Sequence, residues 1–201
     1  MVNVRRLYTT PARMNVLVAC EYSGTVREAF AARGHNAWSC DLLPTDKPGQ
    51  HYQCDVLEVA YNKSMHWDLM IAHPPCTHLA VSGATHFAAK LAENPRIQLD
   101  ALRFVLDLMS APIQRICIEN PVSIISSRIR KPDQCIQPWQ FGHGETKKTC
   151  LWLKGLPLLQ PTNIVEGRSD RIHKMPPSAD RWKLRSTTYA GIAAGMSEQW
   201  G

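Results

Sequence analysis

The chain has 201 residues, of which 44% are apolar, and a formal net charge of +6. This length and composition predict a single domain with a substantial core, and they exclude a largely disordered chain. No apolar run approaches the roughly 20 residues of a membrane span, and the mild positive charge permits a polyanionic partner without requiring one.

Residues 1–13 carry three arginines but no apolar h-region, so they do not form a secretory signal. Because Met14 begins the first apolar run, we expect 1–13 to be a flexible leader and 14–201 to be one domain. The seven cysteines are an odd number and stand mostly in apolar runs. We therefore expect reduced thiols, no disulfides and a cytoplasmic protein.

The first half of the chain alternates short apolar runs with segments of helical spacing. Strands are predicted at 15–20, 36–40, 68–72 and 115–118, and helices at 26–34 and 95–109. This alternation is typical of an α/β fold with a doubly wound, mostly parallel sheet. The small-residue stretch 79–90 is predicted to be a mobile loop.

The second half is less regular. Residues 123–144 mix basic residues with prolines, 147–153 form a predicted strand, and 154–177 resemble a loop. The small-residue segment 189–200 predicts a helix that closes the chain.

Two predicted strands end in residues that can carry chemistry. The strand at 68–72 runs into Pro74, Pro75 and then Cys76, and the strand at 115–118 runs into Glu119 and Asn120. Proline lacks an N–H, so the first strand must stop there. Cys76 then follows the carboxyl end of a strand, which is where open α/β folds bind ligands. A thiol near a carboxyl group favours covalent addition to a ring with an acid nearby. The alternatives are a core cysteine and a capping glutamate.

A cofactor site is predicted at the same edge of the sheet. The turn at 21–25 holds a single glycine, Gly24, and is not the fingerprint of a nicotinamide site. Asp41 and Asp55 each follow a predicted strand, where they can bind a ribose and an adenine amino group, or can simply cap a turn. The candidate zinc ligands are His73, His78, Cys135, His143 and His173. No pair of them has the C-x2-C or H-x3-H spacing of a structural site, so no metal is expected.

These residues, in this order, resemble the cytosine-5 DNA methyltransferases over 14–152 and again near the carboxyl terminus. Residues 20–30 are similar to the family's S-adenosylmethionine loop, Pro75-Cys76 with Ser82-Gly83 to its nucleophile loop, and Glu119-Asn120 to its Glu-Asn-Val motif. The resemblance implies a Rossmann-like class I methyltransferase fold with S-adenosylmethionine as cofactor. It also implies methylation of cytosine C5 through a covalent bond from the nucleophile to C6.

The resemblance assigns a role to each matching position. The implied catalytic residues are Cys76, Glu119, Asn120 and a cation, for which Lys147, Arg128 and Arg130 are the candidates. The implied cofactor-binding residues are Cys20, Glu21, Ser23, Gly24, Thr25, Asp41, Leu42, Asp55, Val56 and Pro75. Ser82, Arg128, Arg130 and Lys148 are the expected contacts to substrate or DNA. Glu119 would stabilise a protonated ring, a task that favours a raised pKa.

The sequence departs from the family pattern at three places. Tyr22 replaces the first glycine of the cofactor loop, Pro121 replaces the valine after Glu-Asn, and the arginine-rich strand has only the lysines at 147–148 as its nearest counterpart. Residues 154–185 stand where the family has a large recognition domain. Small phage-encoded members look similar, and such a protein would work as a monomer in the bacterial host cytoplasm.

The short recognition segment predicts short or relaxed specificity on single- or double-stranded DNA, or a free cytosine nucleotide or RNA as substrate. A non-catalytic module that binds DNA, nucleotide or protein on the same fold is the alternative, and Tyr22 favours it. An amino-methyltransferase is disfavoured because Pro-Pro is followed by Cys76 and not by an aromatic ring.

Overall fold

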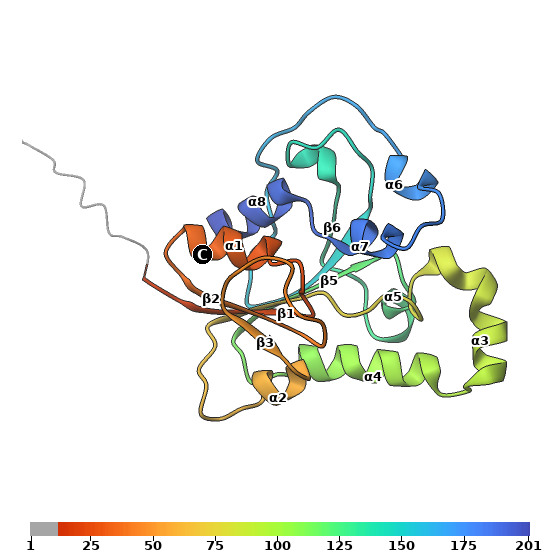
Figure 1. Cartoon of the computed structure of the whole chain (residues 1–201), viewed down its shortest axis with the longest axis horizontal. Coiled ribbons are helices and arrows are strands. Elements are labelled where there is room, and N and C mark those ends of the chain that lie inside the picture. Colours follow the sequence, from red (N-terminus) through yellow and green to blue (C-terminus); the bar gives the residue numbers. More distant parts are fainter. Residues whose placement is uncertain (1–11) are drawn as a thin grey trace, which may run out of the picture.

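A computed structural model describes residues 12–201, which form one seven-stranded sheet with helices on both faces (Figure 1). The strand order is β3-β2-β1-β4-β5-β7-β6, with β7 antiparallel to both of its neighbours and the other pairs parallel. The strands are β1 (Asn15–Ala19), β2 (Asn36–Asp41), β3 (His51–Gln53), β4 (Leu69–Ala72), β5 (Arg115–Pro121), β6 (Gln134–Ile136) and β7 (Thr149–Lys154). The predicted doubly wound, mostly parallel sheet is confirmed. Residues 1–11 of the expected leader lie outside the described residues.

Two layers of helices cover the sheet. On one face lie α1 (Thr25–Ala32) and α8 (Ala190–Trp200), and on the other lie α2 (Val56–Ala60) and α4 (Ile97–Met109) (Figure 1). The remaining helices are η1 (Val81–His86), α3 (Phe87–Glu93), α5 (Ile125–Arg128), η2 (Pro138–Gln140), α6 (Arg171–Lys174) and α7 (Arg181–Ser186). None of the helices in residues 12–201 has the length and apolar character that a membrane crossing requires.

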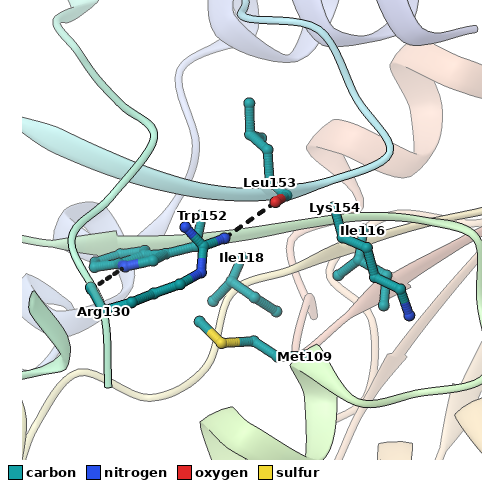
Figure 2. Close-up of a pocket in the computed structure, with 7 residues that line it drawn as sticks. All are labelled: Met109, Ile116, Ile118, Arg130, Trp152, Leu153 and Lys154. Carbon is teal, nitrogen blue, oxygen red and sulfur yellow. Dashed lines mark hydrogen bonds between the residues drawn. The ribbon is translucent and has the colours of Figure 1, made fainter. Parts of the chain in front are cut away.

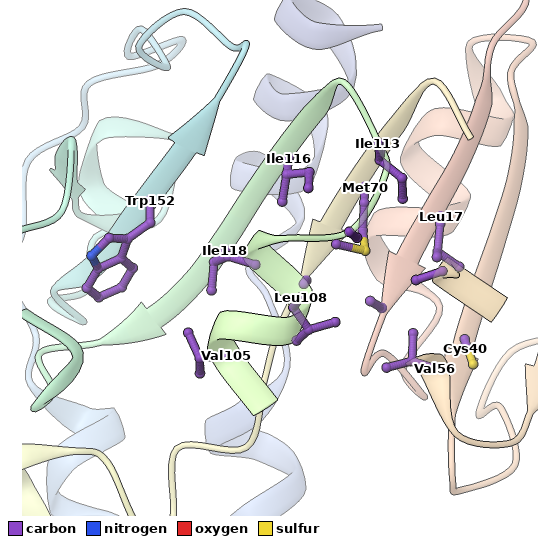
Figure 3. Packing of buried hydrophobic residues seen from close by; sticks show 14 of the residues in the cluster. Leu17, Cys40, Val56, Met70, Val105, Leu108, Ile113, Ile116, Ile118 and Trp152 are labelled. Atoms are coloured by element: carbon purple, nitrogen blue, oxygen red, sulfur yellow. The ribbon is translucent and has the colours of Figure 1, made fainter. Parts of the chain in front are cut away.

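The central strands are apolar throughout because both of their faces are buried. All four residues of β4, Leu-Met-Ile-Ala, are inaccessible to solvent, as expected for a parallel strand between two helical layers. Successive side chains of β4 point to opposite faces of the sheet and so belong to two separate parts of the core. Met70 faces Val105 and Leu108 of α4 (Figure 3), whereas Leu69 and Ile71 belong to the layer under α1 and α8.

Two local predictions are wrong. The stretch 79–90 is not an irregular loop, because η1 and the start of α3 occupy most of it. The strand that carries Glu119 and Asn120 also does not stop ahead of them, because β5 continues to Pro121 by pairing with β7. This pairing brings together residues about thirty apart in sequence, for example Pro121 with Thr149, and a local pattern does not reveal it.

The small residues of α8 allow that helix to pack closely. A methyl group added at Gly191 would overlap the carbonyl oxygen of Phe141, and one added at Gly195 would press on the Phe141 ring. All seven cysteines are free thiols. Of the four that stand in apolar runs, Cys40, Cys117 and Cys150 are buried, and Cys20 is partly exposed.

Candidate active site

The carboxyl ends of β1, β4 and β5 lie side by side. Ala19 pairs with Ala72, which pairs with Ile118 on its other side. The chain leaves β1 toward β2 and leaves β4 toward β5, so the direction of winding reverses between β1 and β4. Open α/β sheets bind their ligands in the crevice at such a switch point. The residues just beyond these strand ends are therefore the candidate site.

Cys76 stands on a loop that β5 holds in place. The side-chain amide of Asn120 donates a hydrogen bond to the carbonyl oxygen of Pro74 at 2.9 Å. The backbone N–H groups of Leu79 and Ala80 both donate to the carbonyl oxygen of Cys76, at 3.0 and 2.9 Å. These bonds fix the thiol at the end of β4, beside the end of β5.

Cys76 is a protonated thiol at rest. Burial raises its pKa, and the negative charge of Glu119 raises it further. A backbone hydrogen bond and the positive charges of Lys147 and Arg185 offset only part of this rise. The thiol must therefore lose its proton during any reaction in which it acts as a nucleophile.

We expect the alkylation of Cys76 by iodoacetamide to be slow at pH 7 and to accelerate through pH 9 without a plateau, because only the thiolate reacts. Peptide mass spectrometry over a pH series measures it, with the exposed Cys135 as an internal reference. Lys147→Gln removes a nearby positive charge and should slow Cys76 at each pH while leaving Cys135 unchanged. A plateau below pH 8 would contradict the raised pKa.

Glu119 forms a buried pair with His73. Nδ1 of His73 lies 2.7 Å from Oε2 of Glu119, and both side chains are about nine-tenths buried, at 11% and 12% exposure. Burial alone would raise the pKa of Glu119, but the hydrogen bond from His73 and the charges of His73 and Lys147 together lower it. The expected raised pKa of Glu119 is therefore wrong. The sequence did not show that a histidine 46 residues away would reach this carboxylate.

His73 shows the complementary shift. Burial alone would lower its pKa, but the hydrogen bond to Glu119 and the negative charges of Glu119 and Glu21 outweigh this effect and raise it. Both shifts favour the charged forms of the pair, in which His73 donates the hydrogen bond and Glu119 accepts it.

Two cations act on this centre. Lys147 lowers the pKa of both Cys76 and Glu119, and its ammonium group lies 3.5 Å from the carbonyl oxygen of Thr187. Arg185, on α7, also lowers the pKa of Cys76. The sequence analysis did not single out Arg185, because only the fold brings α7 to this loop.

The other predicted cations lie elsewhere. Arg130 forms an ion pair with Asp133 at 2.8 Å and donates to the carbonyl oxygen of Leu153 at 3.0 Å. Figure 2 shows Arg130 at a cavity of about 220 Å³ together with Ile116 and Ile118, whose side chains pack toward α4. The structure therefore does not bring Arg130 to Glu119. Arg128 and Lys148 are exposed, as are Ser82 on η1 and Pro75 beside Cys76.

The turn after β1 is tight and is closed by its own carboxylate. Cys20 and Gly24 both have left-handed backbone angles, with φ of 57° and 69°. Oε1 of Glu21 accepts from the N–H of Val26 at 2.6 Å and Oε2 from that of Arg27 at 3.2 Å. The amides at the start of α1, where a phosphate would bind, are thus already used.

The smaller side chains of this turn extend the same network. Ser23 donates to Oε1 of Glu21 at 3.3 Å, and its hydroxyl also lies 3.3 Å from that of Thr25. The first amides of helix α1 are therefore capped by the carboxylate of Glu21, which lies in the turn just before the helix.

Two carboxylates lie near this turn. Asp41, at the end of β2, accepts from the N–H of Leu43 through Oδ1 at 2.9 Å, and Asp55 caps α2 by accepting from Leu57 at 2.9 Å. Burial and then the charge of Asp41 raise the pKa of Cys20, and Asp55 adds to the rise, so both acids lie close to that thiol. Within residues 12–201, the second oxygen of each acid makes no hydrogen bond.

The apolar neighbours of these two acids differ. Leu42, next to Asp41, is 73% exposed and presents an apolar surface beside that carboxylate. Val56, next to Asp55, is buried in the core.

Helix α7 lies over the turn and is held by Tyr22. The Tyr22 hydroxyl lies 3.0 Å from that of Ser186, and its ring centroid lies 5.4 Å from that of Trp182. Lys183 reaches Asp46 at 3.4 Å. Tyr22 thus ties the segment 154–185 to the turn after β1. Within the described part of the chain, no cluster of three or more histidine, cysteine or acidic side chains could hold a metal ion.

No protein-family model and no curated protein sequence matches the chain. Solved structures do match. One is a prophage-encoded Escherichia coli protein provisionally assigned as a DNA modification methyltransferase, at 15% identity and a TM-score of 0.50, with 82% of this chain and 55% of that chain covered. The chain has a methyltransferase fold. A second match is the Entamoeba histolytica methyltransferase EhMeth, at 15% identity and a TM-score of 0.49, with 83% and 61% covered.

Both matches are limited in scope. The chain spans little more than half the length of the first matched protein, and an identity of 15% bears on the fold alone. Activity, substrate and partners therefore have to be argued from the site itself.

Sequence reasoning missed two site residues, His73 and Arg185, which act through contacts between distant segments. It placed Glu21 in the cofactor site but did not foresee that its carboxylate caps α1. One signal was available for His73, which directly precedes Pro74 and Pro75 at the end of a buried strand, in the same loop as Cys76.

Proposed function

We propose that this protein transfers a methyl group from S-adenosylmethionine to C5 of cytosine in DNA, with short or relaxed sequence specificity. The observation that carries the proposal is the position of Cys76 and Glu119 at the carboxyl ends of β4 and β5, with Lys147 lining the same small pocket as Glu119. A thiol beside a buried carboxylate fits covalent addition to a pyrimidine ring better than hydrolysis. The carboxylate is bound by His73, and within residues 12–201 no side chain forms a hydrogen bond to the Cys76 thiol and could serve as its base.

The turn after β1 fits this cofactor better than one with phosphates. Glu21 already occupies the amides of α1, and S-adenosylmethionine has no phosphate that needs them. Asp41 and Asp55 each keep one carboxylate oxygen for a ribose hydroxyl and an adenine amino group, and Leu42 offers an apolar surface to the base. Cys20, Ser23, Gly24 and Thr25 would line the same turn. When bound, the cofactor supplies an electrophilic methyl group.

The chain's own residues would activate the ring. The Cys76 thiolate adds to cytosine C6, which breaks the aromaticity and raises the electron density at C5. Glu119 accepts a hydrogen bond from the exocyclic amine and holds the ring edge, while Asn120 fixes the Cys76 loop through Pro74. Lys147 and Arg185 favour the thiolate electrostatically. Once C5 carries the methyl group, water takes up the C5 proton, the C5–C6 double bond re-forms and Cys76 leaves as the thiolate.

DNA is the proposed substrate because Arg128 and Lys148 are exposed cations that can contact phosphate groups. In duplex DNA the cytosine has to be flipped out of the stack to reach Cys76, at a cost of a few kcal/mol. Single-stranded DNA, RNA or a free cytosine nucleotide avoids that cost, and direct comparison of these substrates separates them.

Cofactor binding tests the proposal first. Isothermal titration with S-adenosylmethionine should show saturable binding, and Asp41→Asn should weaken it about tenfold, the loss of roughly 1.4 kcal/mol expected for a hydrogen bond to a charged acceptor. Glu58→Gln, an exposed acid on α2, is the matched control and should leave the affinity unchanged.

A non-catalytic binding module on the same fold is the second candidate. Tyr22 favours it, because its contacts with Trp182 and Ser186 place α7 over the proposed cofactor turn. No saturable heat with S-adenosylmethionine, together with DNA binding that survives Cys76→Ala, would support this candidate against the enzyme.

A further inference from the structure

A buried histidine lies between two buried glutamates on neighbouring strand ends. Glu21 follows β1, His73 follows β4 and Glu119 lies in β5, and these three strands are adjacent in the sheet. The backbone N–H of His73 donates to the carbonyl oxygen of Ala19 at 2.9 Å, which keeps the histidine aligned with β1. His73 therefore stands between the proposed cofactor turn and the proposed acceptor for the substrate.

Of the two glutamates, only Glu119 forms a hydrogen bond with the side chain of His73. Both oxygens of Glu21 accept from the first amides of α1, so that carboxylate acts on His73 only through its charge. Glu119 is bound directly, through Oε2 at 2.7 Å. No other hydrogen bond to Glu119 from a side chain exists among residues 12–201, so Oε1 is left for a ligand.

Several buried polar atoms at this edge have no partner. Nε2 of His73, Oδ1 of Asn120 and Oγ of Ser123 are buried without a hydrogen bond within the described chain. Folded proteins leave few such groups, and those that remain call for an explanation. Their concentration at the ends of β4 and β5 supports a polar ligand beside Glu119.

We propose that His73 is the positioning residue of Glu119. The Nδ1–H of His73 holds Oε2 of Glu119, so that the carboxylate presents only Oε1 to the substrate. This role rests on the proposed function. A fixed, ionised carboxylate accepts from the exocyclic amine of cytosine in one orientation. Without His73, the buried carboxylate would turn freely and would take up a proton more readily, because burial disfavours its charge.

Other titratable groups surround the pair. Glu21 acts from the turn after β1, and Lys147 acts from the segment ahead of β7. The charge of Glu119 also raises the pKa values of three thiols, those of Cys76, Cys117 and Cys150. Any pH effect assigned to His73 must therefore be checked at Glu119 directly.

The variant His73→Gln tests this role, because its amide can still donate to Glu119 but carries no charge. The pKa of Glu119 should rise, so the acidic limb of the methyl-transfer profile should move toward neutral pH by about one unit or more. We expect kcat to fall about tenfold or more with a smaller change in KM. His66→Gln is the control, since His66 is exposed and pairs only with Asp68.

Nuclear magnetic resonance of the free protein gives a readout that does not depend on activity. The Cε1 signal of His73 should titrate above the ordinary histidine pKa of about 6.5, and Glu119→Gln should move that titration to lower pH. Circular dichroism establishes that each variant is folded.

The outcomes separate the two proposals. An active wild type whose pH profile is unchanged in His73→Gln, or a His73 titration that Glu119→Gln leaves unmoved, overturns the positioning role alone. A wild type with neither cofactor binding nor methyl transfer overturns the proposed function and this role with it. A shifted acidic limb together with a coupled titration supports both.

Discussion

Cys76→Ala should abolish the covalent adduct between this protein and an oligonucleotide that contains 5-fluorocytosine, and should lower methyl transfer to cytosine by more than about 10³-fold. Without the thiol, nothing at the end of β4 can add to C6, so C5 stays unreactive. Fluorine at C5 cannot be removed as a proton, and the wild-type adduct therefore persists. Denaturing mass spectrometry after incubation with S-adenosylmethionine measures it on single- and double-stranded oligonucleotides.

Cys135→Ala is the matched control for this experiment. Cys135 is the exposed thiol, so its removal leaves the core and the Cys76 loop intact. An adduct that survives Cys76→Ala but is lost in Cys135→Ala would disprove the assigned nucleophile. No adduct with either strand state, despite saturable cofactor binding, would redirect the proposal to RNA or a free nucleotide.

Local sequence patterns were sufficient for the framework of the site. The apolar runs that became β1, β4 and β5 are short, continuous and bounded by turn residues, so their positions follow from composition alone. Because the ends of parallel strands meet at one edge, Cys76 and Glu119 could be placed near each other before the pairing was known. The fold itself is confirmed by this sheet order.

The pKa shifts at the site could not be predicted from local sequence patterns. The direction of the Glu119 pKa depends on His73, and that contact exists only because β4 pairs with β5 in the register of Ala72 with Ile118. The charge of Arg185 affects the pKa of Cys76 because α7, which carries Arg185, is held near the site by Tyr22. Long-range contacts of this kind leave no periodic signal in the sequence.

Arg27→Met should lower the free energy of unfolding by about 3 kcal/mol or more, because it leaves several acceptors without a donor at a cost of about 1–3 kcal/mol for each one that is buried. Arg27 is 1% exposed, and its Nε and Nη2 both lie 3.2 Å from Oε1 of Glu28. Its Nη1 donates to the Ser39 and Thr45 hydroxyls at 2.9 and 3.1 Å, and Nη2 donates to the carbonyls of residues 47 and 48 at 2.9 and 3.0 Å. Methionine fills similar space but leaves these acceptors unpaired. Urea denaturation followed by circular dichroism measures the change.

Arg33→Met, at the residue that follows α1, is the control, because Arg33 is exposed and its replacement should change stability by no more than about 0.5 kcal/mol. The guanidinium of Arg27 also fixes the loop that follows Asp41, and Gly49 leaves room for it, since a Cβ there would lie 2.7 Å from the guanidinium carbon. Arg27→Met should therefore weaken S-adenosylmethionine binding even where the protein is still folded. Equal stability of the two variants would mean that water replaces the guanidinium without cost, and Arg27 would then not hold the Asp41 loop in place.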